Sequence, residues 1–191
     1  MGVLTVLFVA SNEELRATFP FRVPVKPEPV SRETKNPFTG TAMKTKEWVP
    51  AEPFPENCGS VESQVKHERT AFSRLPHREY KGLDSLMLAA LWVQIRGGDL
   101  YEHMNAIDRP ALLAPGDPGE WIYRIPDELV SALSDLNESE VEEVARKWGE
   151  LEEFQVSNWP PEDAYEVLIV LSGLSRTASE SDRGLYLWVS L

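Results

Sequence analysis

Hydrophobic residues gather at the two ends of the chain in the pattern of buried strands. Residues 3–9 are rich in β-branched and aliphatic side chains, and residues 184–191 form a second apolar segment. A short, nearly continuous apolar stretch favours a strand that is covered on both faces. Because an exposed strand this hydrophobic would aggregate, we expect the two segments to pair in one small sheet.

Helical periodicity is clearest after Asn137, which with Glu140 forms a capping box. One stripe of the predicted helix consists of Val141, Val144, Ala145, Trp148 and Leu151. Charged residues occupy its other faces. The spacing predicts two ion pairs four residues apart, Glu142 with Arg146 and Glu143 with Lys147.

Further helices are predicted from their start signals. One helix is expected after each of the cap residues Ser11 and Asp84, and one after each of Pro126 and Pro160. Several helices around a small sheet of the N- and C-terminal strands define an α+β fold. We expect residues 1–191 to form one such domain.

A proline-rich extended segment is predicted at about residues 20–56, which hold eight of the fifteen prolines. Its two PxxP spacings suit a polyproline ligand, but we favour an extended strap along the domain surface. Residues 43–49 alternate in the manner of a strand. The lysines at positions 44 and 46 are typical of a sheet edge.

Residues 57–80 show no clear period, and we interpret them as a surface loop with one helical turn. A long irregular loop is often functional. This one contains Cys58, His67 and His77. A thiol beside histidine is the arrangement of a nucleophilic enzyme, so the alternative function is a small-molecule enzyme using Cys58 or the histidines.

Charge is divided unevenly along a chain of net charge −12. Residues 1–110 carry 14 acidic and 14 basic side chains, whereas residues 111–191 carry 17 acidic and 5 basic ones. An acidic half repels nucleic acid and anionic membranes. It suits a basic protein partner, although acidic surfaces also serve solubility alone.

The leading hypothesis is therefore a non-enzymatic acidic protein that binds a basic partner, as an immunity protein masks a toxin. The candidate partner-binding residues are Glu142, Glu143, Glu150, Glu153, Trp159, Glu162 and Asp163. Trp159 has two interpretations, because it can anchor a partner or fold back onto the adjacent helix end. The sequence sets no oligomeric state.

Other chemistry receives little support from the sequence. A single cysteine excludes an internal disulfide and a cysteine-rich zinc site. An oxygen-rich cation site is conceivable at Asp99, Glu102, His103 and Asp108, but the same spacing describes a solvated helix. We predict no metal and no cofactor. The apolar stretches are too short to cross a bilayer and no basic secretory n-region is present, so we expect a soluble, cytoplasmic protein.

The order of elements resembles the YfbM-like family of small bacterial proteins. The resemblance covers residues 1–19 and 82–191, and residues 30–80 depart from it. The segments that carry it are Met1-Gly2-Val3, Glu13-Glu14-Leu15, Gly82-Leu83-Asp84-Ser85-Leu86, Tyr123-Arg124-Ile125-Pro126-Asp127-Glu128-Leu129-Val130 and Gly184-Leu185-Tyr186-Leu187-Trp188. The resemblance implies an α+β fold and a bacterial source, and it implies no site.

Overall fold

The two ends of the chain pair at the centre of a β-sheet. β1 (Leu4–Ala10) runs antiparallel to β8 (Gly184–Ser190), with Val6 opposite Trp188. The computed structural model describes residues 4–35, 41–56, 58, 60–115, 120–152, 154 and 159–190. Across these residues the sheet has six antiparallel strands in the order β2-β6-β7-β8-β1-β5. The predicted α+β fold with paired terminal strands is confirmed.

The other elements alternate between helices and short strands. In chain order they are α1 (Asn12–Thr18), β2 (Val23–Pro24), β3 (Val30–Lys35), β4 (Ala42–Glu47), α2 (Val61–Ala71), the 3-10 turn η1 (Phe72–Arg74), β5 (His77–Lys81), α3 (Ser85–Arg96), α4 (Leu100–Ile107), β6 (Pro110–Leu113), β7 (Glu120–Arg124), α5 (Asp127–Ser134), α6 (Glu138–Gly149) and α8 (Asp163–Glu180).

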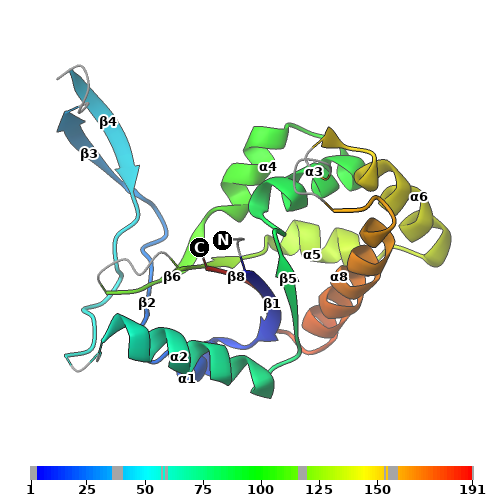
Figure 1. The fold of residues 1–191 in the computed structure, drawn as a ribbon. Helices are drawn as coiled ribbons and strands as arrows, with labels where there is room; N and C mark the ends of the chain where they lie inside the picture. The colour runs from blue at the N-terminus through cyan, green and yellow to red at the C-terminus, as the bar shows by residue number, and fades with distance from the viewer. Residues whose placement is uncertain are drawn as a thin grey trace.

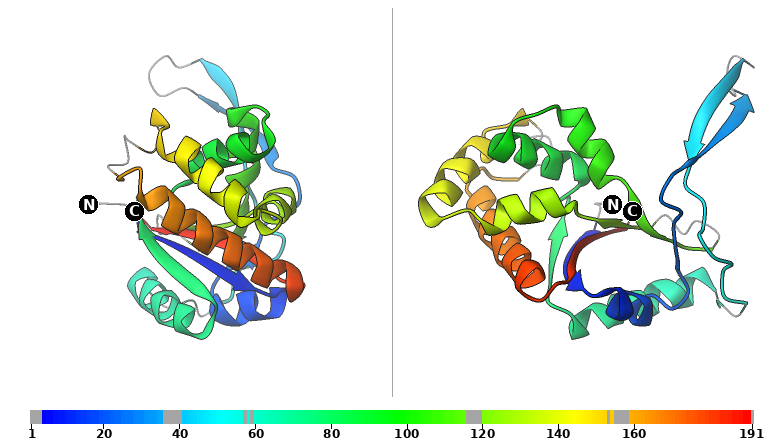
Figure 2. Two further views of the ribbon diagram at one scale, coloured as in Figure 1. Left: turned by 90° about the vertical axis from the view of Figure 1, so that its right-hand side faces the viewer. Right: turned by 180° about the vertical axis from the view of Figure 1, so that it is seen from behind.

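Both faces of the central strands are buried. Leu7 and Leu187 face a large core under α3, α5, α6 and α8, whereas Phe8 and Trp188 face a smaller aromatic core. The smaller core lies on the side of the sheet where α1 and α2 pack (Figure 2). Burial on both sides explains why β1 and β8 are almost continuously hydrophobic.

Helix boundaries follow the predicted caps. Ser11 accepts the Glu14 backbone N–H, and Glu14 accepts the Ser11 backbone N–H at 2.8 Å. This backbone hydrogen bond lowers the pKa of Glu14. Asn137 and Glu140 form the same reciprocal box at the start of α6. Each box satisfies backbone donors that a helix start leaves open.

The proline-rich segment forms a stalk and an arm. Val23 and Pro24 join the sheet edge, and the stalk continues with an Ala51 N–H···O Pro24 hydrogen bond of 2.8 Å. Beyond it, β3 and β4 pair with each other as a separate hairpin. The hairpin projects from the body (Figure 1). We expected a strap along the surface, but β3 and β4 satisfy each other's backbone hydrogen bonds and need no surface beneath them.

The loop prediction for residues 57–80 is wrong. Residues 61–71 form α2, and β5 follows as the edge strand beside β1. The buried side of α2 carries Gln64 and Glu68, which are 3% and 1% exposed, and continues to Phe72. Because two of these inward residues are polar, hydrophobic periodicity does not detect the helix.

Candidate functional site

A groove of about 470 Å³ lies between α6 and the start of α8. We call it the α6–α8 groove. Its lining residues are Glu142, Ala145, Arg146, Glu150, Pro161, Glu162 and Tyr165. Three of the predicted partner-binding residues therefore meet in one hollow, although they come from two separate parts of the acidic segment.

The backbones of the two elements that form this groove approach each other closely at Gly149. Gly149 is the last residue of α6, and a Cβ atom there would lie 2.6 Å from the Pro161 carbonyl oxygen. Real Cβ atoms do not approach backbone oxygens this closely. Glycine thus lets the end of α6 contact the segment that begins α8.

Ion pairing within the groove differs from the prediction. Arg146 donates to the Glu150 carboxylate at 3.1 Å, and not to Glu142. Among the described residues, no ion pair involves Glu142 or Glu162. The groove therefore presents two carboxylates that have no cationic partner within the described chain.

Part of the groove lining is apolar. Ala145 is buried, and the ring of Tyr165 packs partly against the main core. A lysine or arginine side chain combines an apolar stem with a cationic head. An apolar wall beneath free carboxylates matches both parts of such a side chain, and an aromatic ring adds attraction for the cation.

Two other predicted acidic residues lie outside the groove. Glu143 accepts from Lys147 Nζ at 2.6 Å, as the spacing predicted, and this hydrogen bond lowers the pKa of Glu143. Asp163 lies at the start of α8 and lines a different hollow. The prediction for Glu153 falls outside the described residues.

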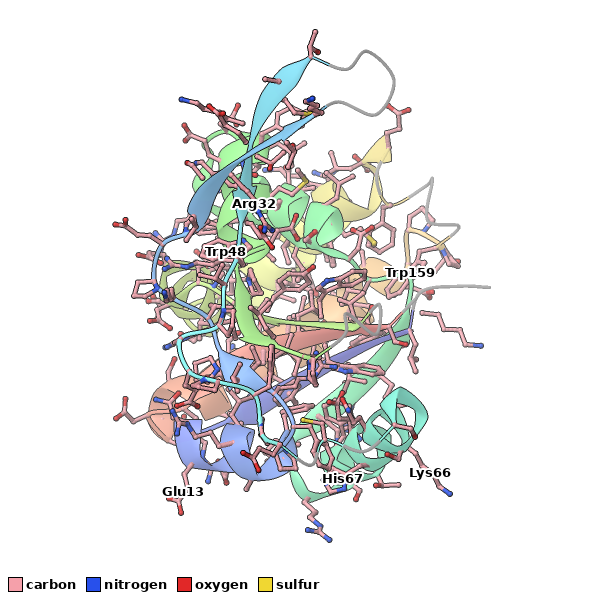
Figure 3. The ribbon with its side chains drawn as sticks, turned by 90° about the vertical axis from the view of Figure 1, so that its left-hand side faces the viewer. Glu13, Arg32, Trp48, Lys66, His67 and Trp159 are labelled. Atoms are coloured by element: carbon pink, nitrogen blue, oxygen red, sulfur yellow. The ribbon has the colours of Figure 1, made fainter. Side chains whose placement is uncertain are left out.

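Trp159 folds back onto the body instead of standing free. Its Nε1 donates to the Lys81 carbonyl oxygen at 2.7 Å, and its ring contacts those of Tyr80 and Phe154. With Asp163 it lines a hollow of about 490 Å³ between α8 and β5. In Figure 3, Trp159 lies towards the right of the body, and the arm residue Arg32 lies nearer the middle of the view. These contacts hold the chain in place just before α8 begins.

The residues of the alternative enzyme hypothesis do not assemble a nucleophile. The Cys58 thiol donates to the Pro55 carbonyl oxygen at 2.8 Å. His77 Nδ1 lies 2.9 Å from the Leu75 carbonyl oxygen, and the His67 ring packs edge-on against Phe21. No hydrogen bond between described atoms joins the thiol to either histidine. A general base must reach the thiol to activate it.

The residues of the conceivable cation site have structural roles. Asp99 caps α4 by accepting the Tyr101 and Glu102 backbone N–H groups. The His103 ring stacks on Trp92 with 4.1 Å between centroids. Burial raises the pKa of Asp108. The described part of the chain contains no cluster of three or more histidine, cysteine or acidic side chains able to hold a metal ion.

Sequence reasoning also missed a buried ion pair beneath α2. Arg22 donates to Glu68 through Nε at 2.7 Å and through a terminal guanidinium nitrogen at 2.8 Å. Both side chains are 1% exposed. Glu68 also accepts from Trp188 Nε1 at 3.3 Å. The two partners are 46 residues apart, so no local spacing could indicate the pair.

Comparisons with known proteins assign no relatives: no family model matches the chain, and neither the curated proteins nor the solved structures include a significant match. Across the described ranges, no helix combines the length and apolarity needed to cross a membrane.

Proposed function

We propose that this protein is a non-enzymatic binding protein that receives a basic segment of a protein partner in the α6–α8 groove. Masking of a basic partner, as an immunity protein masks a toxin, is the form of activity that suits this chemistry. The observation that carries the proposal is the groove itself, where the unpaired carboxylates of Glu142 and Glu162 stand over an apolar wall.

The surrounding charge supports the same partner class. The acidic excess of the whole chain falls in residues 111–191, which include both walls of the groove. A field of one sign accelerates the encounter with an oppositely charged protein and disfavours like-charged competitors. The groove adds short-range contacts, which the long-range electrostatic field of the acidic segment does not provide.

A basic side chain in the groove would make three kinds of contact. Its methylene stem would pack on Ala145, its head would meet the two unpaired carboxylates, and the Tyr165 ring would lie beside the cation. Such a desolvated anchor supplies more binding energy than exposed rim charges.

The proposal is tested by titrating the ¹⁵N-labelled protein with a lysine–arginine hexapeptide and following amide resonances. We expect shifts concentrated on residues 142–150 and 161–165, and weaker binding as salt concentration rises. The double variant Glu142→Gln/Glu162→Gln should weaken peptide binding roughly fivefold or more.

The matched control is Glu13→Gln/Glu56→Gln, which removes the same formal charge at exposed positions away from the groove. We expect it to change affinity less than twofold. Equal losses in the two double variants, or shifts scattered over every acidic surface, would reduce the interaction to general charge attraction and contradict the proposal.

A further inference from the structure

A second cleft lies on a different part of the molecule from the α6–α8 groove. It has a volume of about 720 Å³ and shares no lining residue with that groove. Its walls come from α1, the stalk at β2, the junction of α4 and β6, and the segment between β7 and α5. This volume falls in the range of pockets that bind small molecules.

Three arginines from three elements line this cleft: Arg16, Arg109 and Arg124. We call it the three-arginine cleft. Two acidic residues, Asp127 and Glu128, also line it, so the cleft carries a cationic excess on a strongly acidic protein. A local cationic site in an overall repulsive field favours anions that are small enough to enter it.

Among the described residues, Arg124 is the one arginine of the three that has a close carboxylate partner. Arg124 donates to Asp127 at 2.9 Å, whereas Arg16 approaches its partner Glu52 only to 3.9 Å. Arg109 donates to the Pro27 carbonyl oxygen and lies over the Trp48 ring. Within the described residues no carboxylate pairs with Arg109, so its cationic charge remains available to a ligand.

Tyr186 supplies a further hydrogen-bond donor at the cleft. This residue of β8 lines the cleft although it is only 2% exposed, and its ring stacks on Phe8. Its hydroxyl makes no hydrogen bond to any described atom, and the hydroxyl oxygen is not fully buried, so it can bond to a molecule in the cleft. Burial raises the pKa of Tyr186, so the hydroxyl keeps its proton and can donate it to an acceptor.

The remaining walls are largely apolar. Leu15, Val25 and Leu112 line the cleft together with Pro24, Pro110 and Ala111. Aliphatic walls beside a few converging polar groups suit small organic molecules. A fully hydrated inorganic ion would gain nothing from these walls.

We propose that the three-arginine cleft binds a small organic anion, with its apolar body on the aliphatic walls and its acidic group between the arginines and the Tyr186 hydroxyl. The acidic group is a carboxylate or a phosphate monoester, because both accept hydrogen bonds from guanidinium groups. This inference does not depend on the proposed partner groove.

The test uses four probes of one size: 1-naphthoate, 1-naphthyl phosphate, 1-naphthylmethanol and 1-naphthylmethylamine. Binding is followed by amide shifts of the ¹⁵N-labelled protein. At least one anion should shift the amide resonances of Arg109, Ala111, Leu112, Arg124 and Tyr186, and it should bind roughly tenfold or more tightly than the neutral alcohol and the amine. The tighter anion identifies the acidic group.

Three variants locate the contact. Arg109→Gln and Arg16→Gln should each weaken anion binding severalfold, and Tyr186→Phe should do so while keeping the aromatic ring. Arg16 is exposed and makes only the long contact with Glu52, so its substitution leaves the fold intact. The control Lys66→Gln removes the same charge from the exposed face of α2, outside the cleft (Figure 3), and should leave the affinity unchanged.

The proposal fails if neither anion shifts cleft resonances at millimolar concentration. It also fails if the alcohol binds as tightly as the anions, or if Lys66→Gln weakens binding as much as Arg16→Gln does. None of these outcomes bears on the peptide titration at the α6–α8 groove, so the two proposals stand or fall separately.

Discussion

At the scale of single residues, Arg22 and Glu68 form the most deeply buried ion pair among the described residues. The bidentate contact and the Trp188 indole satisfy both carboxylate oxygens in a place that water does not reach. Removing charges from water is costly. Loss of either side chain would therefore leave the other charge buried without a counterion and would destabilise the fold. The pair links α2 to the segment before β2.

We predict that Glu68→Gln destabilises the protein by about 3–5 kcal/mol, because it leaves the Arg22 charge buried without a counterion. The double variant Arg22→Met/Glu68→Leu should recover most of this loss, since it removes both charges. Urea unfolding measures both effects. A Glu68→Gln cost no larger than that of the exposed control Glu56→Gln would contradict the prediction.

Buried phenols set the response to alkaline pH. Burial raises the pKa of Tyr80 and of Tyr123 from 10.0 to about 12, and the Asp108 carboxylate adds to the effect at Tyr123. The folded protein holds these protons more tightly than the unfolded chain does. Their contribution to stability is complete below about pH 10 and is lost as the pH rises towards 12.

We therefore expect the free energy of unfolding to fall steadily between about pH 10 and 12. Tyr123→Phe should flatten part of this fall, because phenylalanine has no proton to lose. Urea unfolding at a series of pH values measures the slope. The exposed Tyr101→Phe serves as the control and should leave the slope unchanged.

At the scale of elements, local signals located most helices and the central strands. The Ser11 and Asn137 capping boxes and the apolar segments of β1 and β8 depend on neighbouring residues, which a sequence displays directly. The helix α2 was not predicted from hydrophobic periodicity, because the polar residues Gln64 and Glu68 occupy its buried side. Glu68 pairs there with Arg22, which is distant in sequence.

Two glycines on neighbouring helices should respond oppositely to the same substitution. Gly149→Ala should destabilise the protein by roughly 1–3 kcal/mol, because its Cβ would clash with the Pro161 carbonyl and force α6 away from α8. Gly173→Ala on α8 has open space and should stabilise it by about 0.5–1 kcal/mol. The midpoint of thermal unfolding measures both effects. Equal shifts of this midpoint in the two variants would contradict the close approach of α6 to the start of α8.

At the scale of the whole molecule, the β3–β4 arm is separate from the body. It pairs only with itself and projects from the stalk. A two-stranded hairpin without a covered face is marginally stable in water. Its side chains are largely exposed, so the arm contributes little to the core.

Removal of the arm should therefore leave the body folded. Val30 lies opposite Glu47, so residues 31–46 can be replaced by an Asn-Gly turn that closes the shortened hairpin. We expect the free energy of unfolding in urea to change by less than about 1 kcal/mol. A loss of several kcal/mol would mean that the arm packs against the body.

The sequence predicted candidate site residues only where an excess of acidic residues indicated them. The acidic half pointed to Glu142, Glu150 and Glu162, but their meeting in one groove depends on how α6 and α8 pack. The three-arginine cleft had no sequence signal, because Arg16 and Arg109 come from distant parts of the chain. Tertiary folding alone brings such residues together.

The position of β8 has a consequence for synthesis on the ribosome. β8 follows every other strand in the chain, yet it joins β1 and β5 to β7, β6 and β2. Until it leaves the exit tunnel, the nascent chain holds two incomplete strand groups with open, hydrophobic edges. The sheet is therefore completed only once β8 is available, and a pause before that point would expose those edges to chaperones or to other nascent chains.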